Sequence, residues 1–248
     1  MMDSTVAQTL VELNRCFYAE FGEDFSATRQ RIQPGVRSII SRLKGNERIL
    51  DLGCGNGELA RTLARNGFHG EYLGLDFSLP LLREAEAQPG AFPVNFCAVD
   101  ITSPHWSLDT DHCLLIPDYW SLVTSFATLH HIPSRELRLN ILQQVHRLLP
   151  PGGRFILSNW QFLNSEKLKR RIQPWETVGL SAADVDEGDY LLDWRAGGSG
   201  LRYAHHFSAA ELAQLAAETG FSVEESFLSD GENGRLGLYQ IWRKGESR

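Results

Sequence analysis

Two glycines follow a short apolar run at a place where the chain can contact a small ligand. Residues 49–60 have the sequence ILDLGCGNGELA, so Gly53 and Gly55 stand between a predicted strand and a predicted helix. Glycine lets the backbone turn tightly and approach a ligand closely, and the helix start offers unpaired N–H groups and the positive end of its dipole. An ordinary strand-to-helix turn also uses glycine, so these residues alone leave both interpretations open.

A carboxylate about 20 residues later favours a ligand-binding turn over an ordinary strand-to-helix turn. Asp76 ends a second apolar run, where an acidic side chain can bind ribose hydroxyls. The dinucleotide fingerprint G-x-G-x-x-G needs a third glycine at position 58, which is Glu58, and a carboxylate there repels a pyrophosphate. The turn therefore offers a carboxylate for ribose hydroxyls but no site for a pyrophosphate. This combination favours binding of a cationic nucleoside over binding of NAD.

The elements that must position these residues follow an α/β pattern. Short apolar runs alternate with stretches of helical periodicity, as in a parallel sheet with crossover helices. Ser208 and Glu211 have the spacing of a capping box, which predicts a helix start. The last two apolar runs are joined by a segment rich in Asp, Gly and Asn, which predicts an antiparallel hairpin. The predicted fold is a seven-stranded, mostly parallel, doubly wound Rossmann-like sheet, with strands at 48–52, 72–76, 94–99, 121–125, 154–158, 222–228 and 236–243.

Two segments lie outside this alternation. Residues 1–45 predict an N-terminal helical lid, followed by a main domain at 46–248. Within the main domain, residues 160–207 form an insertion after the fifth strand that is far longer than a usual connection, and such insertions are commonly functional. We expect both segments to cover the ligand end of the sheet.

Four features follow one another along the chain in the order of a known family. They are the glycine turn, Asp76, the pair Asp100 and Ile101 after the third strand, and the L-x-P-G-G turn at 149–153. Together they resemble the class I S-adenosylmethionine-dependent methyltransferases over about residues 46–160. The resemblance implies S-adenosylmethionine as cofactor, with the glycine turn at its methionine part, Asp76 at the ribose and residues 100–101 at the adenine. The cofactor-binding residues that it implies are Asp51, Gly53, Cys54, Gly55, Asp76, Phe77, Asp100, Ile101, Phe126 and Ala127.

A narrower resemblance covers most of the chain. The motifs are F-S-x-T-R at 25–29, a histidine pair at 130–131, G-D-x-L-x-x-W at 188–194 and R-Y-x-H at 202–205. In this order they are similar to the eukaryotic tRNA methyltransferases that esterify carboxymethyl-uridine at the wobble position. The resemblance implies tRNA as an alternative acceptor and a small zinc-binding activator as partner, although nothing in the sequence identifies that partner.

The chemistry of the acceptor remains open at this point. A carboxylate is already anionic at neutral pH and needs no general base, which suits a sequence without an unmistakable base. An anionic acceptor requires cations, and each candidate also has a structural interpretation as a solvated, packing or turn residue. The residues that we expect to position the substrate are Arg29, His130, His131, Arg202 and His205.

Composition limits the function classes. With 24 Lys and Arg against 31 Asp and Glu, the net charge of −7 argues against non-specific nucleic-acid binding. No apolar run approaches the roughly 18 residues of a membrane span, and the four cysteines contain no C-x-x-C pair. We therefore expect a cytoplasmic protein with reduced thiols, no membrane segment and no metal site.

The main hypothesis is a methyltransferase that moves a methyl group by in-line displacement to a small-molecule or modified-nucleoside acceptor, including a carboxylate. The first alternative is a tRNA wobble-uridine carboxymethyl methyltransferase. The second alternative is a non-catalytic, cofactor-binding activator of a partner.

Overall fold

The computed structural model describes residues 2–27, 31–87, 92–107, 115–195 and 198–246, and for residues 23–27 it describes the backbone only. The described strands of the main sheet have the order β3-β2-β1-β4-β5-β10-β9. β1 to β5 are parallel, while β10 pairs antiparallel with both β5 and β9. The predicted sheet and its C-terminal hairpin are thus confirmed. Its strands are β1 (Arg48–Leu52), β2 (Glu71–Asp76), β3 (Val94–Ala98), β4 (Leu122–Phe126), β5 (Arg154–Trp160), β9 (Phe221–Ser229) and β10 (Gly237–Lys244).

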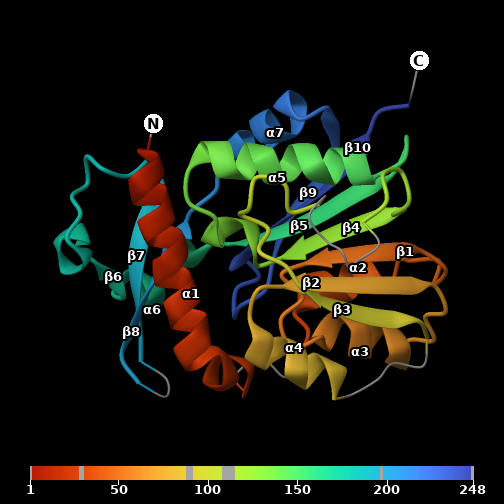
Figure 1. Cartoon of the computed structure of the whole chain (residues 1–248), viewed down its shortest axis with the longest axis horizontal. Helices are drawn as coiled ribbons and strands as arrows, with labels where there is room; N and C mark the ends of the chain where they lie inside the picture. The colour runs from red at the N-terminus through yellow and green to blue at the C-terminus, as the bar shows by residue number, and fades with distance from the viewer. Residues whose placement is uncertain (1, 28–30, 88–91, 108–114, 196–197, 247–248) are drawn as a thin grey trace.

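Helices cover both faces of this sheet because its strands are apolar on both sides. On one face, α5 and α7 pack Ile141, Val145 and Leu212 against the strands, and on the other face α2 and α3 do so through Ile39 and Leu63 (Figure 1). The Oγ of Ser208 accepts a hydrogen bond from the Glu211 N–H at 3.0 Å, as the capping-box spacing predicts. The helices are α2 (Pro34–Ile40), α3 (Glu58–Arg65), α4 (Leu79–Glu86), α5 (Arg135–Leu148) and α7 (Ala209–Glu218).

The insertion after β5 contains a second sheet. Its three strands are antiparallel and have the order β6-β7-β8. Buried Phe162, Leu192 and Ala204 form a small core of its own. The elements between β5 and α7 are η2 (Phe162–Asn164), α6 (Glu166–Lys169), β6 (Ile172–Gln173), η3 (Trp175–Val178), β7 (Asp189–Trp194) and β8 (Gly200–His205).

The N-terminal helix α1 (Ser4–Ala27) lies between this small sheet and the main sheet (Figure 1). Leu10 of α1 shares a buried cluster with Trp175 and Leu191, and Phe17 shares another with Trp194. By contrast, α2 belongs to the core of the main domain. Of the described part of residues 1–45, α1 lies across the end of the sheet, whereas α2 packs into the main-domain core. The division into a lid at 1–45 and a main domain at 46–248 stays a prediction.

Three further features concern the expectations drawn from composition. Cys16 and Cys54 are free thiols, whereas Cys97 is disulfide-bonded, so the expectation that all thiols are reduced is wrong for Cys97. None of the helices in the described part of the chain is long and apolar enough to span a membrane. Within the same residues, no group of three or more His, Cys, Asp or Glu side chains could hold a metal ion. The cytoplasmic location stays a prediction.

Candidate functional site

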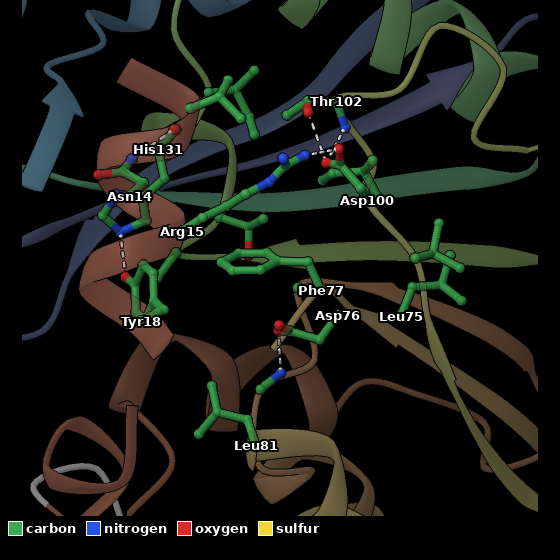
Figure 2. A pocket seen from close by; sticks show the side chains of 18 of the residues that line it. Asn14, Arg15, Tyr18, Leu75, Asp76, Phe77, Leu81, Asp100, Thr102 and His131 are labelled. Carbon is green, nitrogen blue, oxygen red and sulfur yellow. Dashed lines mark hydrogen bonds and ion pairs between the residues drawn. The ribbon is translucent and has the colours of Figure 1, made fainter. Parts of the chain in front are cut away.

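A cavity lies at the carboxyl ends of β1, β2, β3 and β4, and α1 forms its opposite side (Figure 2). It holds about 900 Å³ of empty space when its open mouth is counted. We call its two sides the strand-end wall and the α1 wall. The α1 wall consists of Val11, Asn14, Arg15 and Tyr18. The strand-end wall includes eight of the predicted cofactor residues, Gly53, Gly55, Asp76, Phe77, Asp100, Ile101, Phe126 and Ala127.

The glycine turn follows β1 and has a backbone that other residues rarely adopt. The φ angles of Gly53 and Gly55 are +73° and +55°. A Cβ at Gly53 would lie 2.2 Å from the Oγ1 of Thr128, whereas a Cβ at Gly55 would meet no protein atom within 4 Å. Because Gly55 lines the cavity, the missing side chain leaves room that a ligand can fill.

Asp76 ends β2 beside this turn. Its two carboxylate oxygens accept backbone N–H groups, from Gly55 at 2.9 Å and from Ser78 at 2.8 Å. Burial raises the pKa of this carboxyl, and the two N–H donors oppose that rise. Phe77 is 38% exposed, and its ring lies beneath the Arg15 side chain in the cavity (Figure 2). The site therefore offers an acceptor of hydroxyl hydrogen bonds next to an apolar ring.

Two predicted cofactor residues are absent from the cavity lining. Asp51 is buried below the turn, where its oxygens accept hydrogen bonds from the Tyr72 hydroxyl at 2.6 Å and the Thr124 hydroxyl at 2.7 Å. Burial raises the pKa of Asp51 to about 6. Cys54 is also buried, and burial raises the pKa of its thiol well above the usual value. Both residues support the turn from below in this structure.

Asp100 follows β3 and is the point where the two walls meet. One carboxylate oxygen accepts the N–H of Thr102 at 2.9 Å and its hydroxyl at 2.7 Å. The other oxygen forms an ion pair with Arg15 of α1 (Figure 2). Ile101 is buried beside it and lines the cavity. This corner combines an acidic group with an apolar surface.

The loop after β4 forms the remaining part of the strand-end wall. Ala127 has a φ of +55°, and its N–H donates to the backbone oxygen of Ser158 at 3.0 Å. The short helix η1 (Leu129–His131) follows this loop. It brings His131 into the cavity lining, whereas His130 is 2% exposed and accepts the Trp160 N–H at 3.4 Å through Nδ1.

His131 is bonded through both ring nitrogens. Its Nδ1 lies 3.1 Å from the backbone oxygen of Tyr203 in β8, and its Nε2 lies 2.9 Å from the Tyr18 hydroxyl. Asn14 reinforces this junction, because its amide nitrogen donates to the backbone oxygens of His131 and Tyr203. The α1 wall is therefore fixed to η1 and to the insertion by polar contacts.

The other predicted substrate residues lie elsewhere. Arg202 is 3% exposed, lies behind Tyr18 and is surrounded by aromatic rings, including Trp160 with its centroid 4.8 Å from the guanidinium carbon. His205 is 2% exposed and is absent from the cavity lining, because its Nδ1 bonds to Asp189 at 2.6 Å and its Nε2 to Glu211 at 2.9 Å. Arg29 lies outside the described residues.

The sequence interpretation missed the α1 wall. Val11, Asn14, Arg15 and Tyr18 recur at helical spacing, so they share one face of α1. The adjacent face of α1 packs apolar residues such as Leu10 and Phe17. The polar residues Asn14 and Arg15 beside that apolar face were the signal in the sequence.

Comparison with known proteins relates this geometry to a family. A family model described as a methyltransferase domain matches residues 25–226. A protein of Encephalitozoon cuniculi named "putative methyltransferase" is 31% identical over 208 residues, which span 84% of this chain and 86% of that protein. The tRNA (carboxymethyluridine(34)-5-O)-methyltransferase ALKBH8 of Macaca fascicularis is 31% identical over 160 residues, but these span 61% of this chain and only 21% of that protein.

Solved structures share the fold. The 1,6-didemethyltoxoflavin-N1-methyltransferase of Burkholderia thailandensis, solved with S-adenosylhomocysteine and 1,6-didemethyltoxoflavin, has a TM-score of 0.64 at 19% identity and covers 98% of this chain and 90% of its own. A "putative methyltransferase" in complex with the Trm112 methyltransferase activator of Haloferax volcanii has a TM-score of 0.65 at 16% identity, with coverage of 96% and 99%. Because the family model matches most of its length, the chain belongs to the methyltransferase domain family and has the fold of the class I S-adenosylmethionine-dependent methyltransferases.

Proposed function

We propose that the cavity binds S-adenosylmethionine along the strand-end wall. The ribose hydroxyls lie at Asp76, the adenine lies beside Phe77 near Asp100 and Ile101, and the methionine part lies over Gly53 and Gly55. When bound, S-adenosylmethionine supplies an electrophilic methyl group for in-line displacement. The observation that carries this proposal is the convergence of these residues, from the ends of separate strands, on one cavity.

The chemistry of the wall fits such a ligand. Carboxylates accept hydrogen bonds from hydroxyl and amino groups, and an uncharged ring packs well on Phe77. The open space at Gly55 admits a ligand chain close to the backbone. A pyrophosphate fits less well, because the first turn of α3 carries the carboxylate of Glu58. The side chains of the strand-end wall therefore favour a nucleoside with a cationic tail over a dinucleotide.

We propose a small-molecule or modified-nucleoside acceptor, held between the α1 wall and η1. The supporting observation is that α1 and the insertion together cover the end of the sheet, as expected for a lid that excludes water. Positioning and exclusion of water supply much of the rate of a displacement reaction. In this proposal α1, rather than all of residues 1–45, acts as the lid, together with the insertion at 160–207.

Calorimetry with S-adenosylhomocysteine tests the cofactor part directly. We expect binding in the micromolar range or tighter, and no binding of NAD under the same conditions. Tight binding of NAD without binding of S-adenosylhomocysteine would contradict the proposal. A protein that binds S-adenosylhomocysteine well but labels no acceptor from cell extract or bulk tRNA would favour the non-catalytic activator.

A second candidate function is methylation of carboxymethyl-uridine in tRNA. It is favoured by the similarity to the Macaca fascicularis protein that carries this activity in its name. Lys167 and Arg170 around α6 are exposed and could contact phosphates, whereas the exposed Lys169 is paired with Glu166. A tRNA substrate predicts binding that falls steeply with salt, whereas an enclosed small molecule predicts a shallow dependence. Filter binding of bulk tRNA between 50 and about 200 mM salt separates the two.

A small activator subunit is a further proposal, supported by the Haloferax volcanii complex of the same fold. It predicts that the chain alone is less soluble or less active than the chain with its partner. Affinity purification from the source cell, followed by identification of small co-purifying proteins, tests this prediction. Recovery of a fully active single chain would contradict it.

A further inference from the structure

Four groups form a hydrogen-bonded chain whose two middle members line the cavity. The Tyr203 carbonyl bonds to Nδ1 of His131 at 3.1 Å, and Nε2 of His131 bonds to the Tyr18 hydroxyl at 2.9 Å. The guanidinium of Arg202 makes a side-chain hydrogen bond with the same Tyr18. His131 and Tyr18 both line the cavity, next to the loop after β4 (Figure 2).

The chemistry of the two outer groups decides where the protons lie. A backbone carbonyl only accepts, so Nδ1 of His131 carries the proton and Nε2 of the neutral ring offers its lone pair. A guanidinium only donates, so the Tyr18 oxygen accepts from Arg202. The single proton of Tyr18 is then directed at Nε2. The directions of these hydrogen bonds thus give a path for a proton from Tyr18 to His131.

The surroundings retain this arrangement. Asn14 donates to the backbone oxygens of His131 and Tyr203, which fixes the carbonyl that sets the tautomer. Packed against His131 are the His130 ring, with centroids 4.2 Å apart, and the Tyr18 ring, with centroids 5.6 Å apart. The other titratable groups of the cavity lining are Arg15, Asp76 and Asp100, and Arg15 is paired with Asp100.

We propose that His131 is the general base of this methyltransferase, that Tyr18 relays the proton, and that the acceptor is a weakly acidic O–H or N–H group rather than a carboxylate. The inference rests on the proposed function. As the acceptor oxygen or nitrogen bonds to the methyl carbon, its proton passes to the Tyr18 oxygen and the Tyr18 proton passes to Nε2 of His131. The electron pair of the broken methyl–sulfur bond remains on the sulfur of S-adenosylhomocysteine. The positive charge of the sulfonium is thereby replaced by that of the imidazolium.

The alternative acceptor does not need this chain. A carboxylate is ionised at neutral pH, so a base adjacent to it has no proton to remove. It would need a cation in the cavity instead, and among the described lining residues the one arginine is Arg15, which is paired with Asp100. Arg202 contacts Tyr18 from behind and is 3% exposed. We therefore assign Arg202 as a positioning residue, which orients the Tyr18 proton toward His131.

Nitrogen-15 NMR of the ring nitrogens, in the protein saturated with S-adenosylhomocysteine, tests the proton positions without an acceptor. The expected result is a neutral His131 with the proton on Nδ1, in the wild type and in Tyr18→Phe. A proton on Nε2 at neutral pH would overturn the assignment of His131 as base. Failure of S-adenosylhomocysteine to bind would instead contradict the proposed function, so the two failures are distinguishable.

The product bond tests the acceptor class. Cell extract and bulk tRNA are incubated with S-adenosylmethionine labelled in the methyl group, and the products are treated with mild alkali. Methyl ethers and N-methyl groups keep the label, which is the expected result, whereas methyl esters release labelled methanol, which would overturn the proposal. If no product forms, the NMR result decides.

Variants connect the two experiments. Tyr18→Phe and His131→Ala should lower turnover about a hundredfold or more while leaving S-adenosylhomocysteine affinity within threefold. The wild-type rate should rise with pH through the titration of His131, and this rise should disappear in His131→Ala. The matched control is Tyr119→Phe, which removes a hydroxyl that bonds Glu71 outside the cavity lining and should keep activity. Equal activity of Tyr18→Phe and the wild type would refute the relay.

Discussion

The strand-end wall and the α1 wall of the cavity face the same space but are built differently. The strand-end wall comes from loops that follow neighbouring parallel strands, so the sheet alone brings Gly55, Asp76 and Asp100 together. The α1 wall is held by contacts between segments far apart in the chain, such as Asn14 with Tyr203, 189 positions away. One wall therefore depends on the core of the main domain, and the other depends on apolar packing and polar bonds of α1 to the insertion and to η1.

The insertion is itself fixed by a buried polar network. Asp189 of β7 accepts hydrogen bonds from the Tyr203 hydroxyl at 2.5 Å and from Arg138 of α5 at 3.3 Å, and it also bonds His205. Asp189, Arg138 and His205 are all buried. Tyr203 belongs both to this network and, through its carbonyl, to the His131 junction. The difference between the walls thus predicts that changes in the network loosen one wall while changes at strand ends alter ligand affinity.

The largest effect is expected from Asp189→Ala. The substitution leaves the Arg138 and His205 side chains buried without this carboxylate, which typically costs about 3–5 kcal/mol of unfolding free energy. Urea denaturation followed by fluorescence measures it. Glu187→Ala is the matched control, because Glu187 is an exposed carboxylate in the same insertion and its substitution should change stability by less than about 0.5 kcal/mol. A small loss in Asp189→Ala would show that the network does not hold the insertion.

The same comparison explains which parts could be predicted from sequence. Gly53, Asp76 and Asp100 each follow an apolar run, and the rule that carboxyl ends of parallel strands meet at one edge brings them together without further knowledge. Arg15 and Tyr18 could not be assigned this way, because nothing local to α1 shows that it faces Asp100 and His131. Their positions depend on the long-range contacts that place α1, both to Asp100 and His131 and to the insertion.

The histidines illustrate the limit most clearly. His131 and His205 were equal candidates in the sequence, since each stands beside another histidine near an element boundary. In the structure one lines the cavity and the other is bonded by two carboxylates in the polar network. The capping-box spacing predicted that the Glu211 side chain caps the start of its own helix. In the structure that side chain bonds His205 instead. Such long-range partners decide the role of a polar residue.

The next largest effect is expected at Asp51, which is buried below the strand-end wall, and it concerns how stability depends on pH. Burial raises the pKa of Asp51 from its ordinary value of 3.8 to about 6. Because the unfolded state releases its proton first, the unfolding free energy falls as pH rises from about 4 to about 6, and then becomes level. The contribution is on the order of 2–3 kcal/mol.

Asp51→Asn should remove this contribution. The difference in unfolding free energy between the variant and the wild type, measured by urea denaturation from pH 4 to 7, isolates it from Asp76, whose raised pKa acts in the same direction. The wild type should lose stability relative to the variant as pH rises. A pH-independent difference would mean that Asp51 ionises freely in the folded protein.

A smaller effect is expected from Asp76→Ala. The loss of the proposed ribose ligand should weaken binding of S-adenosylhomocysteine at least tenfold, about 1.4 kcal/mol. Isothermal calorimetry measures the affinity, and Tyr18→Phe is the control on the opposite wall, which should change it by less than threefold. Equal losses in both variants would mean that the two walls do not act separately on the cofactor.

The smallest effect is expected where the walls meet. Arg15 and Asp100 form an ion pair whose side chains are 34% and 32% exposed, so water and salt screen it. A double-mutant cycle of Arg15→Gln and Asp100→Asn should give a coupling of less than about 1 kcal/mol in unfolding free energy, and less at 0.5 M salt than at 0.05 M. A larger coupling that resists salt would mean that this pair holds α1 on the sheet. The α1 wall would then depend on the strand ends rather than on the insertion.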